Sequence, residues 1–252
     1  MTDRDREDQS AFNRHFAWGP TAAALTSEGT AIIVDVLRFS SAVEAATSRG
    51  AVVFPYRWAD EGAQDFANSI SAALANGSNS RGLSLSPLSL LALEHQDRVV
   101  LPSLNGATCA LLAARAGSTV IAGCLRNADA VGRAFVDHDG PITVIACGEH
   151  RPDATLRPAL EDLLGAGAVL TKLGGRPSPD ARAAIATWRD TKHRVDETMK
   201  TCSSGVELQH KGASGDIVYC SQVNVSDIVP VLSDGAFRCA SPKQLLRGAS
   251  NQ

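Results

Sequence analysis

The chain has 252 residues, of which 44% are hydrophobic and 5% aromatic, and its formal net charge is -3 at pH 7. This apolar content suffices for one large α/β domain or two small ones. The charge and the few aromatic residues argue against a nucleic-acid surface, which carries a basic stripe with interleaved aromatic side chains. No apolar stretch is long enough to span a membrane. We therefore expect a small-molecule partner, with no nucleic acid and no membrane.

The beginning of the chain is predicted to be a flexible tail over residues 1–15. Its first ten residues are too strongly charged for a signal peptide, which favours a cytoplasmic location. No composition shift marks a linker further along the chain. Residues 16–252 are therefore predicted to form a single α/β domain.

The first strong strand signal is the apolar run 31–34, which is followed by Asp35, Arg38, Ser40 and Ser41 and then by a helical pattern. A buried strand that ends in a polar turn and a helix is the usual position of a phosphate site in an open α/β sheet. An alternative stays open, in which Asp35 and Arg38 only pair with each other and Ser40 caps the helix.

The next segments continue the alternation of strand and helix. Residues 51–56 are predicted to form a strand and residues 58–75 a helix. The turn-rich segment 76–82 is either a plain surface loop or part of a mobile lid. A second helix is predicted over residues 86–95, because it begins with serine before proline.

A second strand with a polar end covers residues 98–101 and leads to Ser103, Asn105 and Gly106. Glycine lets the backbone approach a ligand closely, and the polar side chains suit phosphate or carboxylate oxygens. The segment is not a Walker loop, because no Gly-Lys-Ser/Thr follows. It is nevertheless predicted to bind substrate.

Two further strands are predicted, over residues 119–123 and 142–147, and the first runs into Arg126 and Asn127. Strands that alternate with helices imply a mainly parallel sheet with helices on both faces, and this is the fold class that we expect. Four strands that each end in a polar turn favour one shared site.

A helix with two adjacent carboxylates near its start, Glu161 and Asp162, is predicted over residues 159–170. Carboxylates are the protein ligands that Mg²⁺ prefers, together with phosphate and water. Acidic residues in a first turn also complement the helix dipole, and position alone favours that reading.

The last third of the chain is predicted to hold a long helical stretch over 181–208, a capped turn around a helix over 202–212, and strands over 216–224 and 228–232. The six cysteines form no CxxC pair, so the usual structural zinc signature is missing. Reduced thiols are expected.

These motifs, in their order along the chain, resemble the 2-phosphosulfolactate phosphatase family. The segments that carry the resemblance lie between about Phe16 and Ala240, and they are 16–20, 34–41, 50–51, 103–106, 125–128, 146–148, Glu161 with Asp162, Ser204 with Gly205, Glu207 with Leu208, and Val229 with Pro230. The family usually has proline where this chain has Leu104, a departure that bears on the substrate rather than on the fold.

The resemblance implies a Mg²⁺-dependent phosphatase with its family's own α/β fold, which converts 2-phosphosulfolactate to 3-sulfolactate in coenzyme M biosynthesis. Phosphoryl transfer needs charge neutralisation and an in-line water. We expect Asp35 and Arg38 to be catalytic, and Asp35, Glu161 and Asp162 to contact the metal. The substrate-binding residues would be Ser40, Ser41, Ser103, Asn105, Gly106, Arg126 and Asn127, with Arg126 facing the sulfonate or carboxylate.

Two other functions fit the same residues. One is a phosphatase for another small phospho-hydroxy acid, and the other is a non-catalytic module that binds a phosphorylated metabolite. A homodimer is compatible with the sequence.

Overall fold

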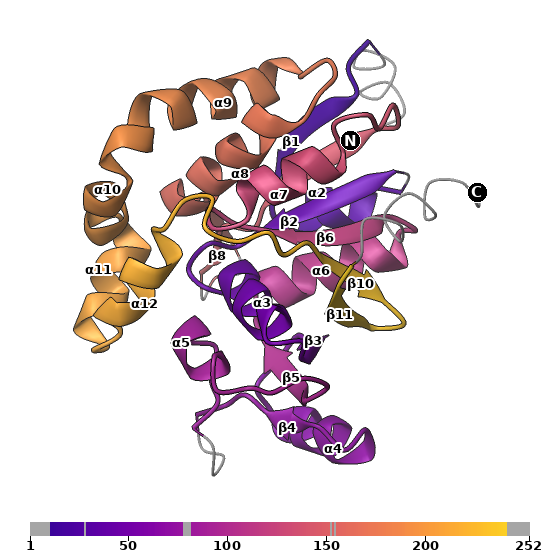
Figure 1. Ribbon diagram of the computed structural model, residues 1–252, viewed down its shortest axis with the longest axis vertical. Helices are drawn as coiled ribbons and strands as arrows, with labels where there is room; N and C mark the ends of the chain where they lie inside the picture. The colour runs from indigo at the N-terminus through magenta and orange to yellow at the C-terminus, as the bar shows by residue number, and fades with distance from the viewer. Residues whose placement is uncertain (1–10, 28, 78–81, 152, 154, 241–252) are drawn as a thin grey trace.

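The structure, a computed structural model, describes residues 11–27, 29–77, 82–151, 153 and 155–240 (Figure 1). Within these residues a nine-stranded sheet runs in the order β1-β7-β2-β6-β10-β11-β3-β5-β4. Its strands are β1 (Arg14–Trp18), β2 (Thr30–Val34), β3 (Val52–Tyr56), β4 (Ala73–Leu74), β5 (Arg98–Pro102), β6 (Thr119–Gly123), β7 (Ile142–Ala146), β10 (Pro230–Ser233) and β11 (Ala236–Cys239).

The sheet consists of two parallel blocks. Strands β1, β7, β2 and β6 pair in parallel, as do β3, β5 and β4. The antiparallel hairpin β10–β11 lies between the blocks and pairs with β6 on one side and with β3 on the other. The predicted α/β fold with a mainly parallel sheet is confirmed.

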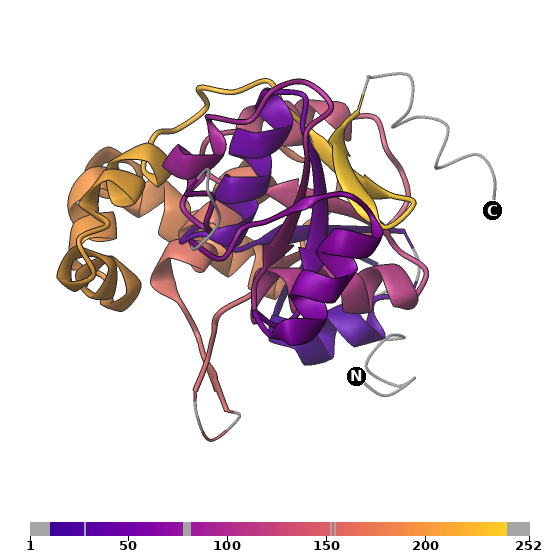
Figure 2. The same cartoon turned by 90° about the horizontal axis from the view of Figure 1, so that it is seen from below.

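A separate two-stranded hairpin, β8 (Glu149–His150) with β9 (Leu156–Arg157), follows directly after β7. Figure 2 shows it projecting away from the sheet and its covering helices. The sequence analysis predicted no strand in this segment, so the hairpin was not foreseen. Because each strand has only two residues, it gives little periodic signal.

Helices cover both faces of the sheet, as predicted. They are α2 (Gly19–Leu25), α3 (Phe39–Ser48), α4 (Glu61–Ser69), α5 (Pro87–Leu90), α6 (Gly106–Arg115), α7 (Ala128–Ala134), α8 (Leu160–Lys172), α9 (Pro179–Thr191), the 3-10 helix η1 (Lys192–Arg194), α10 (Val195–Thr201), α11 (Ser203–His210) and α12 (Ser214–Cys220).

Strand β2 shows how the two faces are built. Ile32 and Val34 point into a core with α7, α8 and α9, whereas Ala31 and Ile33 point into a second core with α2, α3 and α6. Alternate residues of a strand face opposite sides of its sheet. A strand buried on both faces therefore reads as a continuous apolar run, which is why 31–34 was identifiable.

Helices α9 to α12 follow one another along one side of the molecule, and α12 ends beside α3 and α5 (Figure 1). The sequence predicted one helical stretch over 181–208 where the structure has three helices and a 3-10 turn. The prediction of a capped turn before the α11 helix is confirmed, because the Cys202 thiol accepts a hydrogen bond from the Gly205 amide at 3.4 Å.

The predicted strand over 216–224 is wrong, because this segment begins with helix α12. Its buried side chains include Ile217 and Cys220, three residues apart, while Val218 between them is 52% exposed. That spacing fits a helix and not a strand. The run of apolar and β-branched residues resembled a strand because a seven-residue helix offers less than two full periods.

The predicted helix over 58–75 is too long. Helix α4 stops at Ser69, and the Ala72 amide donates to the Ala67 carbonyl at 2.9 Å, while Ser71 has φ +53. This is a Schellman end with a left-handed residue outside the helix. The predicted helix over 86–95 is likewise only α5, four residues long.

Strand β1 was not predicted, and it begins at Arg14, inside the predicted tail. Residues 1–10 of that tail lie outside the described residues, as does part of the 76–82 loop.

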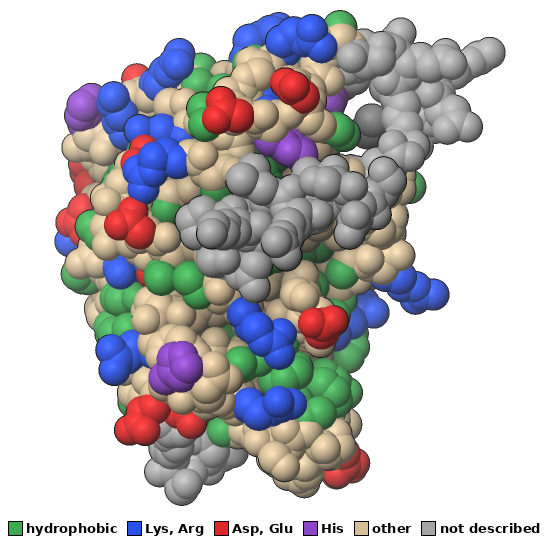
Figure 3. Space-filling model, turned by 45° about the vertical axis from the view of Figure 1, so that its right-hand side comes forward, with side chains coloured by type: hydrophobic (Ala, Val, Ile, Leu, Met, Phe, Trp, Pro, Cys, Tyr) green, Lys and Arg blue, Asp and Glu red, His purple; other side chains and the backbone are tan. Residues whose placement is uncertain are grey.

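All six cysteines are free thiols, as expected. None of the helices in the described ranges has the length and apolar character needed to cross a membrane. Figure 3 shows acidic and basic side chains intermixed over one face of the molecule.

Candidate functional site

The site is centred on Asp35, which follows β2. Its Oδ1 accepts a hydrogen bond from the Phe39 amide and its Oδ2 accepts one from the Gly106 amide, both at 3.0 Å. Asp35 is 6% exposed. The carboxylate therefore joins the loop after β2 to the loop after β5, and the sequence placed candidate residues in both loops.

Glycine at position 106 allows the loop after β5 to approach the loop after β2 this closely. A Cβ at position 106 would lie 2.3 Å from the Phe39 ring, so any larger residue would push the two loops apart. The requirement for glycine here is one of packing, and it serves the contact with Asp35.

Asp162, near the start of α8, joins the loop after β2 to the loop after β7. Its Oδ1 accepts from the Val36 amide at 2.8 Å, and its Oδ2 accepts from the Gly148 amide at 2.9 Å. The neighbouring Glu161 is equally buried, but its Oε2 has no hydrogen-bond partner among the described residues. A buried carboxylate oxygen without a partner is costly unless a ligand satisfies it.

The carboxylates raise one another's proton affinity. Burial, with the nearby charges of Glu149 and Glu161, raises the pKa of Asp35 to about 7, although the amide hydrogen bonds oppose the shift. Burial and the charges of Asp35 and Glu161 likewise raise the pKa of Asp162 well above its usual value. Burial also raises the pKa of Glu149. The site is thus an accumulation of buried negative charge.

Arg38 lies beside this cluster and pairs with a residue that the sequence did not single out. Its Nη1 is 2.6 Å from Asp216 Oδ2, and the other oxygen of Asp216 accepts from the Ser86 hydroxyl. The Arg38 side chain is 22% exposed and that of Asp216 is 3% exposed. The guanidinium is therefore accessible while its partner is buried. The sequence considered pairing between Arg38 and Asp35, whereas the structure pairs Arg38 with Asp216.

Several predicted substrate-binding side chains hold the loops together in this structure. The Ser40 and Ser41 hydroxyls donate to the carbonyls of Ile33 and Val36, both at 2.8 Å. The Ser103 hydroxyl accepts from the Gly106 amide at 3.1 Å. These three residues lie around Asp35, and their contact with substrate stays a prediction.

Asn105 and Asn127 are placed differently. Asn105 Oδ1 accepts from the His150 amide at 3.1 Å, which ties the loop after β5 to the β8–β9 hairpin. Asn127 Oδ1 accepts from the Cys124 amide, while its Nδ2 donates to the carbonyls of Ala122 and Ile228. Asn127 thus has its polar atoms occupied by backbone groups.

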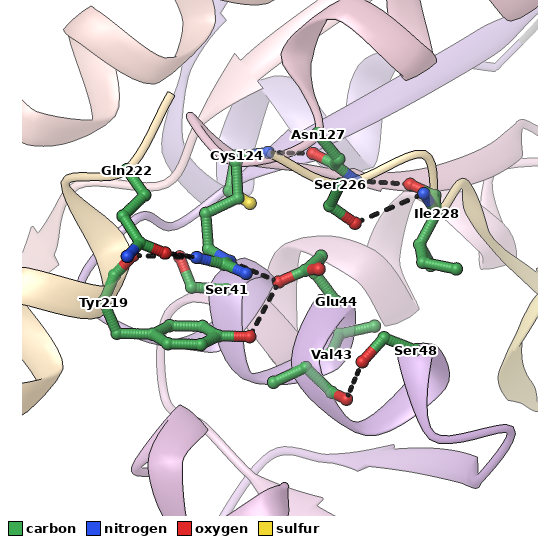
Figure 4. Close-up of polar contacts among 12 residues, drawn as sticks. Ser41, Val43, Glu44, Ser48, Cys124, Asn127, Tyr219, Gln222, Ser226 and Ile228 are labelled. Atoms are coloured by element: carbon green, nitrogen blue, oxygen red, sulfur yellow. Dashed lines mark hydrogen bonds and ion pairs between the residues drawn. The ribbon is translucent and has the colours of Figure 1, made fainter. Parts of the chain in front are cut away.

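Arg126 belongs to a buried network with Glu44, Tyr219 and Gln222, which are labelled in Figure 4. Its Nε is 2.8 Å from Glu44 Oε2, and its Nη1 donates to the Tyr219 carbonyl at 3.2 Å and to the Gln222 side chain. The guanidinium stacks 3.6 Å from the centre of the Tyr219 ring, and the Tyr219 hydroxyl donates to Glu44. These contacts join α3, the loop after β6 and α12.

Arg157 is a second arginine near the site that the sequence did not select. Its Nη2 donates to the Ser204 hydroxyl at 2.9 Å. The pKa of Glu207 is lowered mainly by its hydrogen bond with Lys211, and the charges of Arg157 and, more weakly, Arg38 contribute to the same shift. Ser204 and Glu207 belong to the α11 segment whose motif contributed to the family resemblance. That motif was the available signal for this part of the site.

The residues fit a divalent cation. A divalent cation would offset part of the charge of the three buried carboxylates, of which Asp35 and Asp162 have raised pKa values. Glu161 Oε2 has no hydrogen-bond partner among the described residues and is the oxygen that a cation could take. Among the described residues no group of three or more His, Cys, Asp and Glu is arranged as a metal cage. Mg²⁺ commonly uses one or two carboxylates together with phosphate and water, so such a cage is not required.

Comparison with known proteins gives a consistent result. A family model described as 2-phosphosulpholactate phosphatase matches residues 20–235. The chain is 26% identical over 223 residues to a probable 2-phosphosulfolactate phosphatase of Pseudothermotoga lettingae, covering 86% of this chain and 96% of that protein. It is 29% identical over 210 residues to the 2-phosphosulfolactate phosphatase of Methanothermobacter thermautotrophicus, covering 82% and 88%.

Proposed function

Because the chain belongs to the 2-phosphosulpholactate phosphatase family, we propose that it is a phosphoric monoester hydrolase that converts 2-phosphosulfolactate and water to 3-sulfolactate and phosphate. The observation that carries the proposal is the buried cluster of Asp35, Glu161 and Asp162 beside the accessible guanidinium of Arg38. We extend the proposal to the coenzyme M step of the family and to a location in the cytoplasm, where reduced thiols persist.

Mg²⁺ is part of the proposal. Glu161 would hold it together with Asp35 or Asp162, and when bound it would neutralise charge on the phosphoryl group. The raised pKa values of Asp35 and Asp162 support this, because a cation would offset the effects of burial and of carboxylate repulsion that raise them.

The chain's own residues have separate tasks in this reaction. Arg38 contacts the phosphoryl oxygens and stabilises their charge as the bond to the leaving oxygen breaks. Asp35 orients the attacking water by a hydrogen bond to one of its carboxylate oxygens. Asp162 fixes the loops after β2 and β7, and so keeps Asp35 in place. Orientation of this kind accounts for much of the rate in phosphoryl transfer.

The test is phosphate release by the purified protein from 2-phosphosulfolactate, with Mg²⁺ and with a chelator. The same assay is run with 2-phospholactate, 2-phosphoglycolate and 4-nitrophenyl phosphate. We expect release that depends on Mg²⁺ and is fastest from the sulfonated ester. Phosphate release from another ester alone would support a phosphatase activity but would rule out 2-phosphosulfolactate as its substrate. Binding without turnover would favour a non-catalytic module.

A further inference from the structure

We propose that Arg157, on strand β9, is the specificity-determining residue for the substrate's second acid group, the sulfonate or carboxylate that is not transferred. The inference rests on the proposed phosphatase function and assigns a substrate contact to a residue outside the predicted set. It replaces Arg126 in the role that the sequence suggested for it.

The position of Arg157 is fixed by contacts at the base of its hairpin. Glu149 lies directly opposite Arg157 across the two strands, so both side chains are on the same face. The preceding Gly148 donates to Asp162, and the Asn105 side chain accepts from the His150 amide. The base of the hairpin is thereby attached directly to the loop after β5 and, through Asp162, to the loop after β2.

The charge of Arg157 is available to a ligand. Its guanidinium makes a hydrogen bond to the neutral Ser204 hydroxyl, and it forms no ion pair within 4.0 Å in the described part of the chain. Glu207, whose pKa it lowers, is 2.5 Å from Lys211 Nζ. Arg157 is half-buried, and its charge acts on Glu149 without an ion pair at salt-bridge distance in the described part of the chain. Such a guanidinium suits a charge-assisted, bidentate contact with an acid group.

Arg157 and Arg38 together would supply cationic partners for both anionic groups of the substrate. Arg157 is tied to the Asp35 site through Glu149, which pairs with it across the hairpin and whose charge acts on Asp35. A phosphorylated acid carries two anionic groups a few bonds apart and needs two cationic partners. Arg38 follows Asp35 in the loop after β2, where the phosphoryl group is proposed to react, and this leaves Arg157 for the other group.

Arg126 cannot take this role without breaking its own network. Its side chain is 10% exposed, pairs with Glu44, and stacks on Tyr219 (Figure 4). Withdrawing it toward a substrate would leave Glu44, which is 1% exposed, as an unpaired buried charge.

The experiment compares Arg157→Met with Arg151→Met, a control in which an exposed arginine of the same hairpin is replaced. Calorimetry measures the affinities for 3-sulfolactate and for inorganic phosphate, and the assay gives KM and kcat for 2-phosphosulfolactate. For Arg157→Met we expect 3-sulfolactate affinity to fall and KM to rise by about 10- to 100-fold, with kcat and phosphate affinity changed less than about threefold. Arg151→Met should behave as the wild type, and Arg157→Lys should recover part of the loss.

Unchanged 3-sulfolactate binding in Arg157→Met would overturn the proposal, as would an equal loss of both ligands. If Arg157→Met does not fold, Arg157→Lys and Arg157→Gln carry the same comparison. A wild-type protein that binds 3-sulfolactate through Arg157 but releases no phosphate would refute the phosphatase function and leave this assignment standing. A wild-type protein that binds no 3-sulfolactate would overturn both.

Discussion

At the residue scale, Glu161 and Asp162 are adjacent carboxylates with different surroundings. Both oxygens of Asp162 accept backbone amides, whereas Glu161 Oε2 has no partner in the described ranges. Glu161→Gln should therefore abolish Mg²⁺-dependent turnover without lowering the thermal unfolding midpoint, because it removes a buried charge and breaks no amide contact. Asp162→Asn should lower the free energy of unfolding by about 1–3 kcal/mol, since its NH₂ would face an amide donor.

Paired measurements of unfolding and phosphate release on the two variants check this expectation. The assignment of Glu161 as the free ligand fails if Glu161→Gln keeps wild-type turnover. Equal destabilisation by the two substitutions would mean that Glu161 is held by the protein as firmly as Asp162.

The Arg38 and Asp216 pair allows a second residue-scale prediction. Arg38→Ala should stop turnover and also destabilise the fold by about 2–4 kcal/mol, because Asp216 is then a buried charge without its cation. The double variant Arg38→Ala with Asp216→Asn should recover most of that stability and none of the activity. Denaturant unfolding and the phosphatase assay separate the two effects. A double variant no more stable than Arg38→Ala would contradict the argument.

At the element scale, the sequence predicted the strands that are buried on both faces and the loops that follow them. Runs such as 31–34 and 119–123 carry that signal themselves. The contacts between elements were beyond its reach. Arg38 and Asp216 are 178 positions apart, and Asp216 stood in a segment that was misread as a strand. Likewise, Arg157 could not be recognised while its hairpin was taken for a loop.

The role of α12 gives an element-scale prediction. The contact of Arg126 with Glu44 and Tyr219 connects this helix to α3, so Arg126→Met should cost about 3–5 kcal/mol of unfolding free energy. The matched control is Arg133→Met, whose side chain is 59% exposed and whose ion pairs are worth less than about 1 kcal/mol. At a temperature where Arg126→Met stays folded, its KM for 2-phosphosulfolactate should match the wild type. A large rise in KM in that folded variant would mean that Arg126 does contact the substrate.

At the scale of the whole molecule, the fold concentrates buried acidic groups where its two parallel blocks and the α9 to α12 segment meet. Asp35 comes from β2, the Gly106 amide from the loop after β5, and Asp216 from α12. No single element could bury these carboxylates. Burial of these carboxylates destabilises the fold as a whole, so the effect should be measurable in the free energy of unfolding of the protein.

The sign of that effect follows from the pKa shifts. The folded protein holds the proton of Asp35 up to about pH 7, whereas the unfolded chain releases it near 4. The folded state binds more protons in that interval, so the metal-free protein should lose stability as the pH rises from about 4 to about 7. Asp162 and Glu149 act in the same direction. Burial lowers the pKa values of His15 and His138, which opposes this trend.

The free energy of unfolding of the metal-free protein should therefore be lower at pH 7.5 than at pH 5.5 by about 2 kcal/mol. Its thermal unfolding midpoint should be lower by roughly 5 °C. Adding Mg²⁺ at pH 7.5 should raise the midpoint again, because the ion binds the folded state and offsets the carboxylate repulsion. Calorimetry at the two pH values, with chelator and with Mg²⁺, measures both effects. Glu161→Gln should narrow the pH difference, since the charge of Glu161 contributes to both raised pKa values. A metal-free midpoint that rises between pH 5.5 and 7.5 would mean that these carboxylates are already ionised and compensated within the fold, and the reason for placing a cation among them would be lost.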